Sequence, residues 1–220
     1  MVLFEALSVS VIGIPLGILT ALKRDTIIDN VLTTSSLFAI SMPNFWLGTM
    51  LILLFSVKLG WLPSGGMTHF FWTATGLKQV ILPAFALSTS TIASFMRIGR
   101  SAMLDVLQSD YIRTAKSKGL SSKVVIFVHA LRNALIPLLT QLGTSFGGLL
   151  GGAIVTEQVF VVNGLGTYLI NAINSRNYPA VQSTVLVIAA MFIIINLIVD
   201  IVLMIQFMAL LQRLLMMEKE

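Results

Sequence analysis

Residues 109–137 read SDYIRTAKSKGLSSKVVIFVHALRNALIP and form the longest polar interval in an otherwise apolar sequence. Together with Arg97 and Arg100 just upstream, this interval holds half of the 14 Lys and Arg residues. Apolar runs flank it on both sides. The interval therefore predicts a short structured element between two apolar helices.

The interval has the pattern of two helices joined by one break. Ser109 or Asp110 can cap the first helix, because a side-chain oxygen there can accept a hydrogen bond from a free N–H one turn later. Gly119 stands where a left-handed residue would end that helix at the least cost. Ser121 or Ser122 can cap the next helix, which soon becomes apolar. A short capped helix in this position is more typical of a docking element than of a linker.

Two small residues in the interval have a distinctive spacing. Three residues separate Ala115 from Gly119, and nine more lead to His129. This spacing resembles the EAA loop of ABC-importer permeases, whose general pattern is Glu-Ala-Ala-x3-Gly-x9-Ile-x-Leu-Pro. The chain keeps the second Ala and the Gly, and it departs at the Glu, first Ala, Ile and Pro positions, which hold Arg113, Thr114, His129 and Arg132. Those departures resemble the variant form of the oligopeptide/dipeptide/nickel permease family.

The resemblance implies one transmembrane permease domain over residues 1–220, with residues 105–137 as a cytoplasmic loop that couples it to ATPase subunits. The residues implied for ATPase coupling are Asp110, Tyr111, Arg113, Thr114, Ala115, Lys118, Gly119 and Leu120. The implied fold is that of the type I importer permeases, all-α and polytopic, with six spans in the family. The alternative interpretation is a basic cytoplasmic loop whose charges only follow the positive-inside rule of membrane topology.

The composition is that of an integral membrane protein. The chain is 56% hydrophobic and 10% charged, whereas soluble proteins average about 25% charged residues. Its basic balance therefore carries no indication of nucleic-acid binding. There is no cysteine, which excludes disulfides and thiolate chemistry. No phosphate-binding loop, metal-ligand spacing or catalytic triad stands out, so we expect no catalytic, cofactor-binding or metal site in this chain.

The apolar runs predict five transmembrane helices. They cover residues 2–22, 33–57, 80–103, 130–156 and 181–212. Gly13 and Gly17 have the GxxxG spacing that lets helices approach closely. Pro43 and Asn44 would interrupt hydrogen bonding in the second span unless they are buried against protein or a cavity. Residues 157–179 are expected to form a loop.

The distribution of charge predicts the orientation. Eleven of the 14 Lys and Arg residues lie in or next to residues 23–30, residues 97–132 and the C-terminus, which places these segments in the cytoplasm. Five spans then put the N-terminus outside, so we expect a preceding span that this sequence lacks. The resemblance covers residues 6 to about 203, and the last residues depart from the family's usual ending. An inactive, truncated copy is therefore one alternative.

Several intramembrane residues are candidates for packing or for the transport pathway. Three glycines in the fourth span recur every four residues and favour close helix packing: Gly143, Gly147 and Gly151. Polar residues that can line a pathway or gate are Asn44, Glu157, Asn196 and Asp200. Structural roles compete with this interpretation, namely ion pairing for Asp200 and capping of the turn at residues 164–166 for Glu157.

The functional prediction is the transmembrane subunit of an ATP-driven importer of peptides or a related small solute, located in a prokaryotic cell membrane. The partners implied are a second, homologous permease subunit, two cytoplasmic ABC ATPases that use ATP and Mg, and an extracytoplasmic solute-binding protein. The chain itself is expected to bind no cofactor and to be no enzyme. The alternative is a secondary transporter or channel, which would need its own coupling-ion site.

Overall fold

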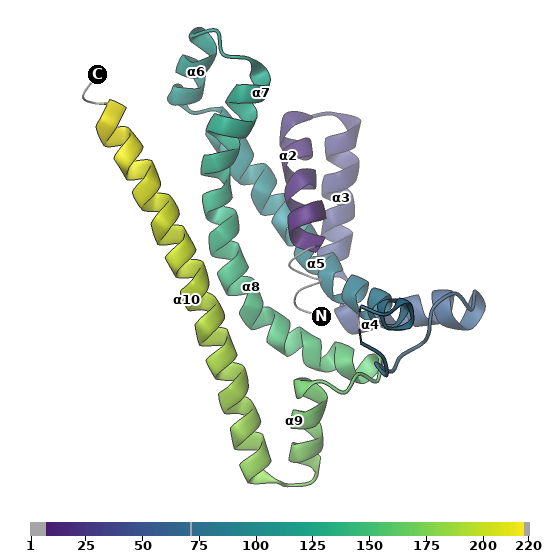
Figure 1. Ribbon diagram of the computed structural model, residues 1–220. Helices are drawn as coiled ribbons and strands as arrows, with labels where there is room; N and C mark the ends of the chain where they lie inside the picture. The colour runs from purple at the N-terminus through teal and green to yellow at the C-terminus, as the bar shows by residue number, and fades with distance from the viewer. Residues whose placement is uncertain (1–7, 71, 218–220) are drawn as a thin grey trace.

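The structure is a computed structural model that describes residues 8–70 and 72–217, apart from the side chains at 10, 143–144, 146–152, 199, 202–203 and 205–217. Every regular element in this part of the chain is a helix, so the predicted all-α class is confirmed (Figure 1). The elements are η1 (Val9–Gly13), α2 (Ile14–Leu22), α3 (Ile27–Ser41), α4 (Asn44–Leu51), η2 (Ile52–Lys58), α5 (Ala74–Leu107), α6 (Asp110–Ser117), α7 (Ser122–Val124), η3 (Val125–Ala130), α8 (Leu131–Val159), α9 (Leu165–Asn174) and α10 (Tyr178–Met217), where η marks a π-helical segment.

The first helices pack on α5 through two glycines. A Cβ atom at Gly13 would lie 3.2 Å from the carbonyl oxygen of Ile92, and one at Gly17 would lie 2.8 Å from that of Met96. Such distances leave no room for larger residues, so the expected close packing at the GxxxG spacing is confirmed. The start of the first predicted span, residues 2–7, lies outside the described residues.

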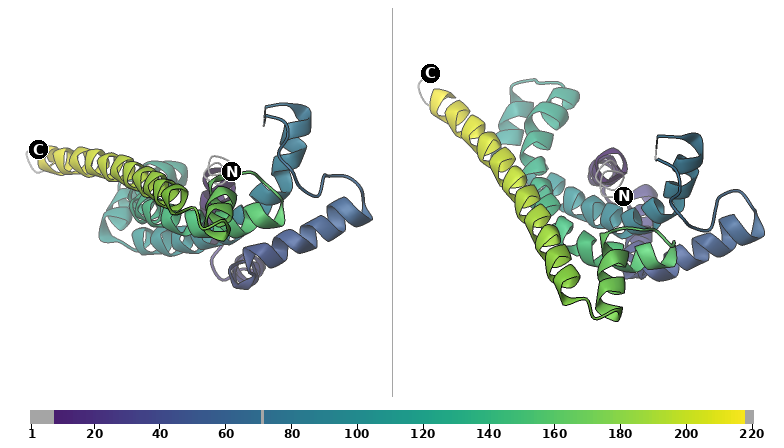
Figure 2. Two further views of the ribbon diagram at one scale, coloured as in Figure 1. Left: turned by 90° about the horizontal axis from the view of Figure 1, so that it is seen from below. Right: turned by 60° about the horizontal axis from the view of Figure 1, so that its bottom comes forward.

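The second predicted span is two helices rather than one. α3 begins at Ile27, and the helix stops at Met42 and Pro43, both of which have extended backbone angles. Proline disfavours helical geometry in the residue before it and lacks an N–H for the helix ladder. The break predicted at this proline is confirmed, and the two helices are bent by 100°. Figure 2 shows the resulting arm of α4 and η2, which projects away from the other helices.

α5 is the central helix of the fold, and its buried residues contribute to three apolar clusters. Phe95 is fully buried between Val9 and Leu138. Nearer the start of α5, Leu82 packs with Phe160 of the segment after α8. The third cluster lies beneath α6 and is described with the candidate site. Because α5 contacts both the N-terminal helices and α8, it fixes where the polar interval at its end can lie.

The segment expected as a loop over residues 157–179 contains a helix. α9 occupies Leu165–Asn174 and is followed by a short turn into α10. The prediction of a plain loop is therefore wrong: residues 157–159 still belong to α8, and the Glu157 carboxylate accepts a hydrogen bond at the start of α9. α10 then runs for 40 residues, longer than the predicted span over 181–212.

Three helices are long and apolar enough to cross a membrane, and a fourth span results if the bent pair α3 and α4–η2 is counted as one. The three are α5, the helix over residues 122–142 and the helix over residues 178–198. The described part of the first predicted span contains a shorter apolar helix, Val11–Leu22. These numbers refer only to the described residues.

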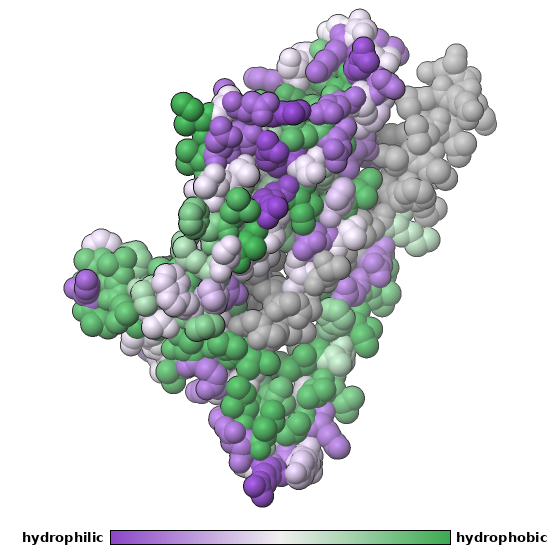
Figure 3. Space-filling model, turned by 180° about the vertical axis from the view of Figure 1, so that it is seen from behind, coloured by the Kyte–Doolittle hydropathy of each residue, from purple (hydrophilic) through white to green (hydrophobic). Residues whose placement is uncertain are grey.

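The basic segments gather at one end of the molecule. The turn between α2 and α3, the helices α6 and α7, and the end of α10 all lie at the top of Figure 1. In Figure 3, hydrophilic side chains are concentrated at that same end, whereas apolar side chains cover the α4–η2 arm and much of the opposite half. This arrangement agrees with the single membrane side that the charge distribution predicts for these segments.

Candidate functional site

α6 begins at the predicted place but without the predicted cap. Ser109 has the extended backbone of an N-cap residue, yet its hydroxyl donates to the Val106 carbonyl oxygen at 2.6 Å instead of accepting from the helix. Ser121 stands at the start of the next helix and likewise makes no side-chain cap bond. The cap positions are therefore confirmed, and the predicted hydrogen bonding at them is wrong.

The end of α6 follows the prediction closely. Gly119 has a φ of 77°, and its N–H donates to the Lys116 carbonyl oxygen at 3.0 Å. The N–H of Leu120 donates to the Ala115 carbonyl oxygen at 3.4 Å. This pair of bonds is a Schellman motif, in which a glycine with positive φ satisfies the last carbonyls of the helix.

The inner face of α6 packs into the chain's own core. Ile112 is completely buried and Ala115 is 7% exposed. They form one cluster with Ala21 of α2, Met103 of α5 and Ala130 of η3. The expected place of Ala115 on a docking surface is therefore revised, because its side chain faces the spans. A small side chain there lets α6 lie close against three other elements.

The outer face of α6 is exposed and mostly polar. Its exposed residues are Asp110, Tyr111, Arg113, Thr114, Lys116, Ser117 and Lys118, with Gly119 and Leu120 beside them. Asp110 and Arg113 approach each other at 3.8 Å, but their side chains are 99% and 79% exposed. Such a pair contributes little to stability, so both charges stay available to a partner. Seven of the eight predicted coupling residues thus share one accessible surface.

A hydrogen bond joins this surface to the following span. Asn133 of α8 donates through Nδ2 to the Tyr111 hydroxyl at 2.8 Å, and also approaches the His129 carbonyl oxygen at 3.3 Å. The segment between them, η3, has π-helical geometry, which is frequent at functional sites. Movement of α6 would therefore reach α8 through both the chain and this bond. The sequence contained Asn133 within the recognised motif but gave no signal for its partner.

A buried ion pair near the same end was not predicted. Arg100 of α5 donates through two nitrogens to the two carboxylate oxygens of Asp29, each at 2.7 Å. The Asp29 side chain is 2% exposed and also accepts from the backbone of Asp25 and the hydroxyl of Thr33. This bidentate arrangement locks α3 to α5. The only sequence signal was an acidic residue at the start of an apolar helix.

Asn44 lies at the break between α3 and α4. Its Oδ1 accepts a hydrogen bond from the Ser90 hydroxyl of α5 at 3.1 Å. The broken helix is therefore tied to the middle of α5 at Asn44, which is half-buried, whereas Pro43 beside it is exposed.

Glu157 binds the start of α9. Its Oε2 accepts from the Thr167 N–H at 2.8 Å, and a Cβ atom at Gly164 would overlap its carboxyl group. A carboxylate is favourable at this end of a helix because the free N–H groups carry partial positive charge. The capping alternative for Glu157 is thus the arrangement observed.

The remaining candidates are not brought together with these groups. Asn196 of α10 donates to the Phe192 carbonyl oxygen one turn earlier, and Asp200 is exposed with no ion pair among the described residues. Gly143, Gly147 and Gly151 belong to α8, but their packing lies outside what the structure describes.

Among the residues that the structure describes, no three His, Asp or Glu side chains converge in a group that could hold a metal ion. A pocket does lie beside α5, between α3 and α8, and it contains Arg97. In the sequence, Arg97 stood out only as one cation of the basic segment.

Apolar helices of membrane-crossing length, a basic end and an amphipathic helix anchored between two spans define a polytopic membrane protein. The family of binding-protein-dependent transport system inner membrane components matches residues 13–207, and the chain belongs to this family. The resemblance stated from the sequence is confirmed.

Curated relatives of this family are named as peptide permeases. The chain is 45% identical over 210 residues to a di/tripeptide transport system permease of Pseudomonas aeruginosa, covering 86% of this chain and 62% of the relative. It is 42% identical over 219 residues to a dipeptide transport system permease of Alkalihalophilus pseudofirmus, covering 90% and 66%. It is 44% identical over 213 residues to the dipeptide transport system permease of Escherichia coli, covering 86% of this chain and 63% of the relative. The chain therefore spans a little under two thirds of the length of these relatives.

Proposed function

We propose that this chain is a permease subunit of an ATP-driven peptide importer, in which it forms half of the translocation pathway. In this proposal α6 docks on a cytoplasmic ATPase, a second homologous permease completes the pathway, and an extracytoplasmic binding protein delivers the solute. ATP and Mg are used by the ATPase partners and not by this chain.

The construction of α6 is the observation that carries the proposal. Its inner face, with Ile112 and Ala115, is buried in the chain's own core, while its outer face is polar and exposed. A helix built in this way can accept force from a partner on one side and pass it to the spans on the other as a rigid-body rotation. Family membership and the peptide permeases among the relatives support the same proposal.

The exposed apolar surface of α10 supports the expectation of lipid or a second permease beside it. Leu186, Ile193 and Met204 are 69%, 64% and 64% exposed. Apolar side chains at this level of exposure along one helix require an apolar environment.

Co-purification tests the proposal. The full chain, tagged and extracted from membranes of its host in mild detergent, should retain ATPase subunits and hydrolyse ATP. Binding protein loaded with a dipeptide should stimulate that hydrolysis. A chain that supports peptide uptake but never retains an ATPase would instead be a secondary transporter, the alternative interpretation.

Topology provides an independent test. A reporter fused within residues 105–125 should report the cytoplasm, and one within residues 61–75 should report the exterior. The reverse result would contradict the proposal, because an ATPase can dock only on the cytoplasmic side.

A further inference from the structure

A polar stripe runs along one side of α5. Ser90, Ser94, Arg97 and Ser101 follow one another at intervals of three or four residues, so they lie on one face of the helix. Arg97 and Ser101 are exposed, and the two other serines are half-buried. The opposite side of α5 carries the fully buried residues, such as Phe95 and Met103. The stripe is therefore the side of α5 that the chain does not use for its own core.

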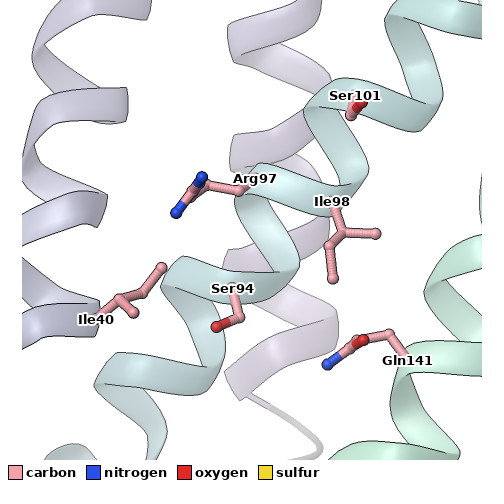
Figure 4. Close-up of a pocket in the computed structure, with 6 residues that line it drawn as sticks. All are labelled: Ile40, Ser94, Arg97, Ile98, Ser101 and Gln141. Atoms are coloured by element: carbon pink, nitrogen blue, oxygen red, sulfur yellow. The ribbon is translucent and has the colours of Figure 1, made fainter.

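The stripe opens into a pocket of about 420 Å³. The pocket is lined by Ile40 of α3, by Ser94, Arg97, Ile98 and Ser101 of α5, and by Gln141 of α8. Figure 4 shows Arg97 extending from α5 toward the side of Ile40, and Gln141 reaching toward α5 from the other side. The pocket is wide open on one side, and its lining combines apolar walls with a few polar groups, as the lining of small-molecule sites does.

Arg97 has no acidic partner among the described residues, in contrast to its neighbour Arg100. The Arg100 guanidinium is engaged by the buried carboxylate of Asp29, at 2.7 Å through two nitrogens. No described ion pair or hydrogen bond engages Arg97 one turn earlier on the same helix. A charge inside a membrane segment is costly, and such residues face a bundle interior or a water-filled cavity. An arginine without an acidic partner in the described part of the chain therefore favours an aqueous surface over lipid for this stripe.

We propose that Arg97 binds the carboxylate of the peptide as it passes along this stripe. This inference rests on the proposed function, because it names the part of the solute that the pathway contacts. A guanidinium presents parallel N–H donors that match a carboxylate, and such charge-assisted pairs are among the stronger hydrogen bonds in proteins. Ser94 and Ser101 flank Arg97 with hydroxyls for peptide N–H and C=O groups, while Ile40 and Ile98 provide apolar wall for a side chain.

The absence of cysteine from the sequence allows a test that needs no knowledge of the solute. Ser94→Cys would be introduced into the full chain in membranes that contain its partner subunits. It would then be reacted with anionic sulfonatoethyl and cationic trimethylammonioethyl methanethiosulfonate. We expect reaction with both reagents, faster for the anionic one, and a fall of about tenfold in the anionic-to-cationic rate ratio when Arg97→Gln is added.

Two controls accompany the labelling. Phe85 lies on α5 outside the pocket lining and is 54% exposed, so Phe85→Cys should stay unreactive if that side of the helix faces lipid. Lys78→Gln removes a charge from the same helix outside the pocket and should leave the rate ratio of the Ser94→Cys variant unchanged. An unreactive Ser94→Cys, or a rate ratio that Arg97→Gln does not alter, would overturn the proposal. The second result would show that the Arg97 charge does not act on the pocket.

An uptake measurement then identifies the carboxylate. Wild type, Arg97→Gln and Arg97→Lys would be compared for uptake of labelled Ala-Ala and of its C-terminal amide, with the same binding protein throughout. Because the binding protein's preference is common to all three, a change in the acid-to-amide ratio reports on the permease. We expect Arg97→Gln to lower uptake of the acid by about tenfold or more, with little effect on uptake of the amide. Arg97→Lys should retain part of the uptake of the acid, because it keeps the positive charge.

The outcomes separate the two proposals. Equal loss for acid and amide, or no loss at all, would contradict a carboxylate site at Arg97 while leaving the importer intact. Absence of uptake and of retained ATPase in the wild type would instead contradict the proposed function. In that case the labelling ratio still decides whether Arg97 provides an anion site that faces water.

Discussion

Two Asp–Arg pairs near the basic end of the molecule have the same chemistry and opposite surroundings. Asp29 and Arg100 are joined at 2.7 Å with the carboxylate 2% exposed, and they lock α3 to α5. Asp110 and Arg113 lie 3.8 Å apart on α6 with both side chains in solvent. The first pair holds the spans together, and the second leaves its charges for another molecule. Burial, and not residue type, separates the pair that holds the helices together from the pair whose charges stay accessible.

Breaking the buried pair should have the largest effect. Asp29→Ala leaves the Arg100 guanidinium without its partner, and removing one member of a buried pair costs about 3–5 kcal/mol. We expect a clear fall in the thermal-unfolding midpoint of the detergent-solubilised chain and lower protein levels. Asp25→Asn is the matched control, since the Asp25 side chain is 81% exposed and asparagine tolerates the positive φ of 61° at this position. Similar losses of stability from both variants would show that burial does not separate the two Asp–Arg pairs.

Charge on the inner face of α6 should have the next largest effect. Ala115→Asp places a carboxylate among Ile112, Met103 and Ala130, where no cation is available among the described members of the cluster. An unpaired buried charge is expensive, so α6 should detach from the spans. Thr114→Asp, on the exposed side, is the control. Limited proteolysis of the loop should increase for the first variant only; equal cleavage would place Ala115 on the surface.

Gly119→Val should affect coupling more than stability. The residue has a φ of 77°, which a β-branched residue adopts only with strain, and nothing lies within 4 Å of where its Cβ would be. The cost is on the order of 1 kcal/mol, which is too small to unfold the chain. We expect normal protein levels, weak retention of ATPase subunits and lost uptake.

Gly60→Val is a matched control for that variant, because Gly60 has a φ of 64° and equally open surroundings outside the coupling loop. It carries the same backbone strain without touching α6. If both variants transport equally well or equally poorly, the special role given to Gly119 is wrong.

The smallest effects should come from the exposed charges. Arg113→Ala removes a solvent-exposed pair worth at most about 1 kcal/mol, so thermal stability should hardly change. In the proposed docking, retention of ATPase subunits at low salt should nevertheless fall, because one charge has been removed from the outer face of α6, and retention should depend less on salt than in wild type. Lys123→Ala, exposed and beyond the break, should match wild type in both measurements. A lower unfolding midpoint for Arg113→Ala would contradict the contrast between the two pairs.

Local signals in the sequence predicted two helix ends correctly, although they did not predict α9 or the absence of side-chain cap bonds at Ser109 and Ser121. Gly119 and Pro43 each ended a helix as expected, because positive φ and a missing N–H are properties of the residue itself. The angle of 100° at Pro43 could not be predicted, since it depends on what α4 packs against. The pairing of Asp29 with Arg100 spans 71 residues and had no local signal.

The sequence predicted which residues form the candidate site, but not which of them face the spans and which face solvent. An eight-residue helix makes about two turns, so sequence alone could not decide which side of α6 would face the spans. Ala115 was placed on the docking side, whereas the structure buries it. The pocket at Arg97 was missed because its walls come from α3, α5 and α8, which only tertiary packing brings together.

The cap on α9 has a consequence for how the sequence can drift over generations. An alanine at 164 would push the Glu157 carboxyl, the free end of a flexible side chain, away from Thr167, so mutations at 157 and 164 should be tolerated together more readily than singly. Position 166 has no such freedom, because a Cβ atom there would lie 2.7 Å from the Ile154 Cα. An alignment of descendants should therefore show 157 and 164 changing as a correlated pair, with glycine at 166 throughout.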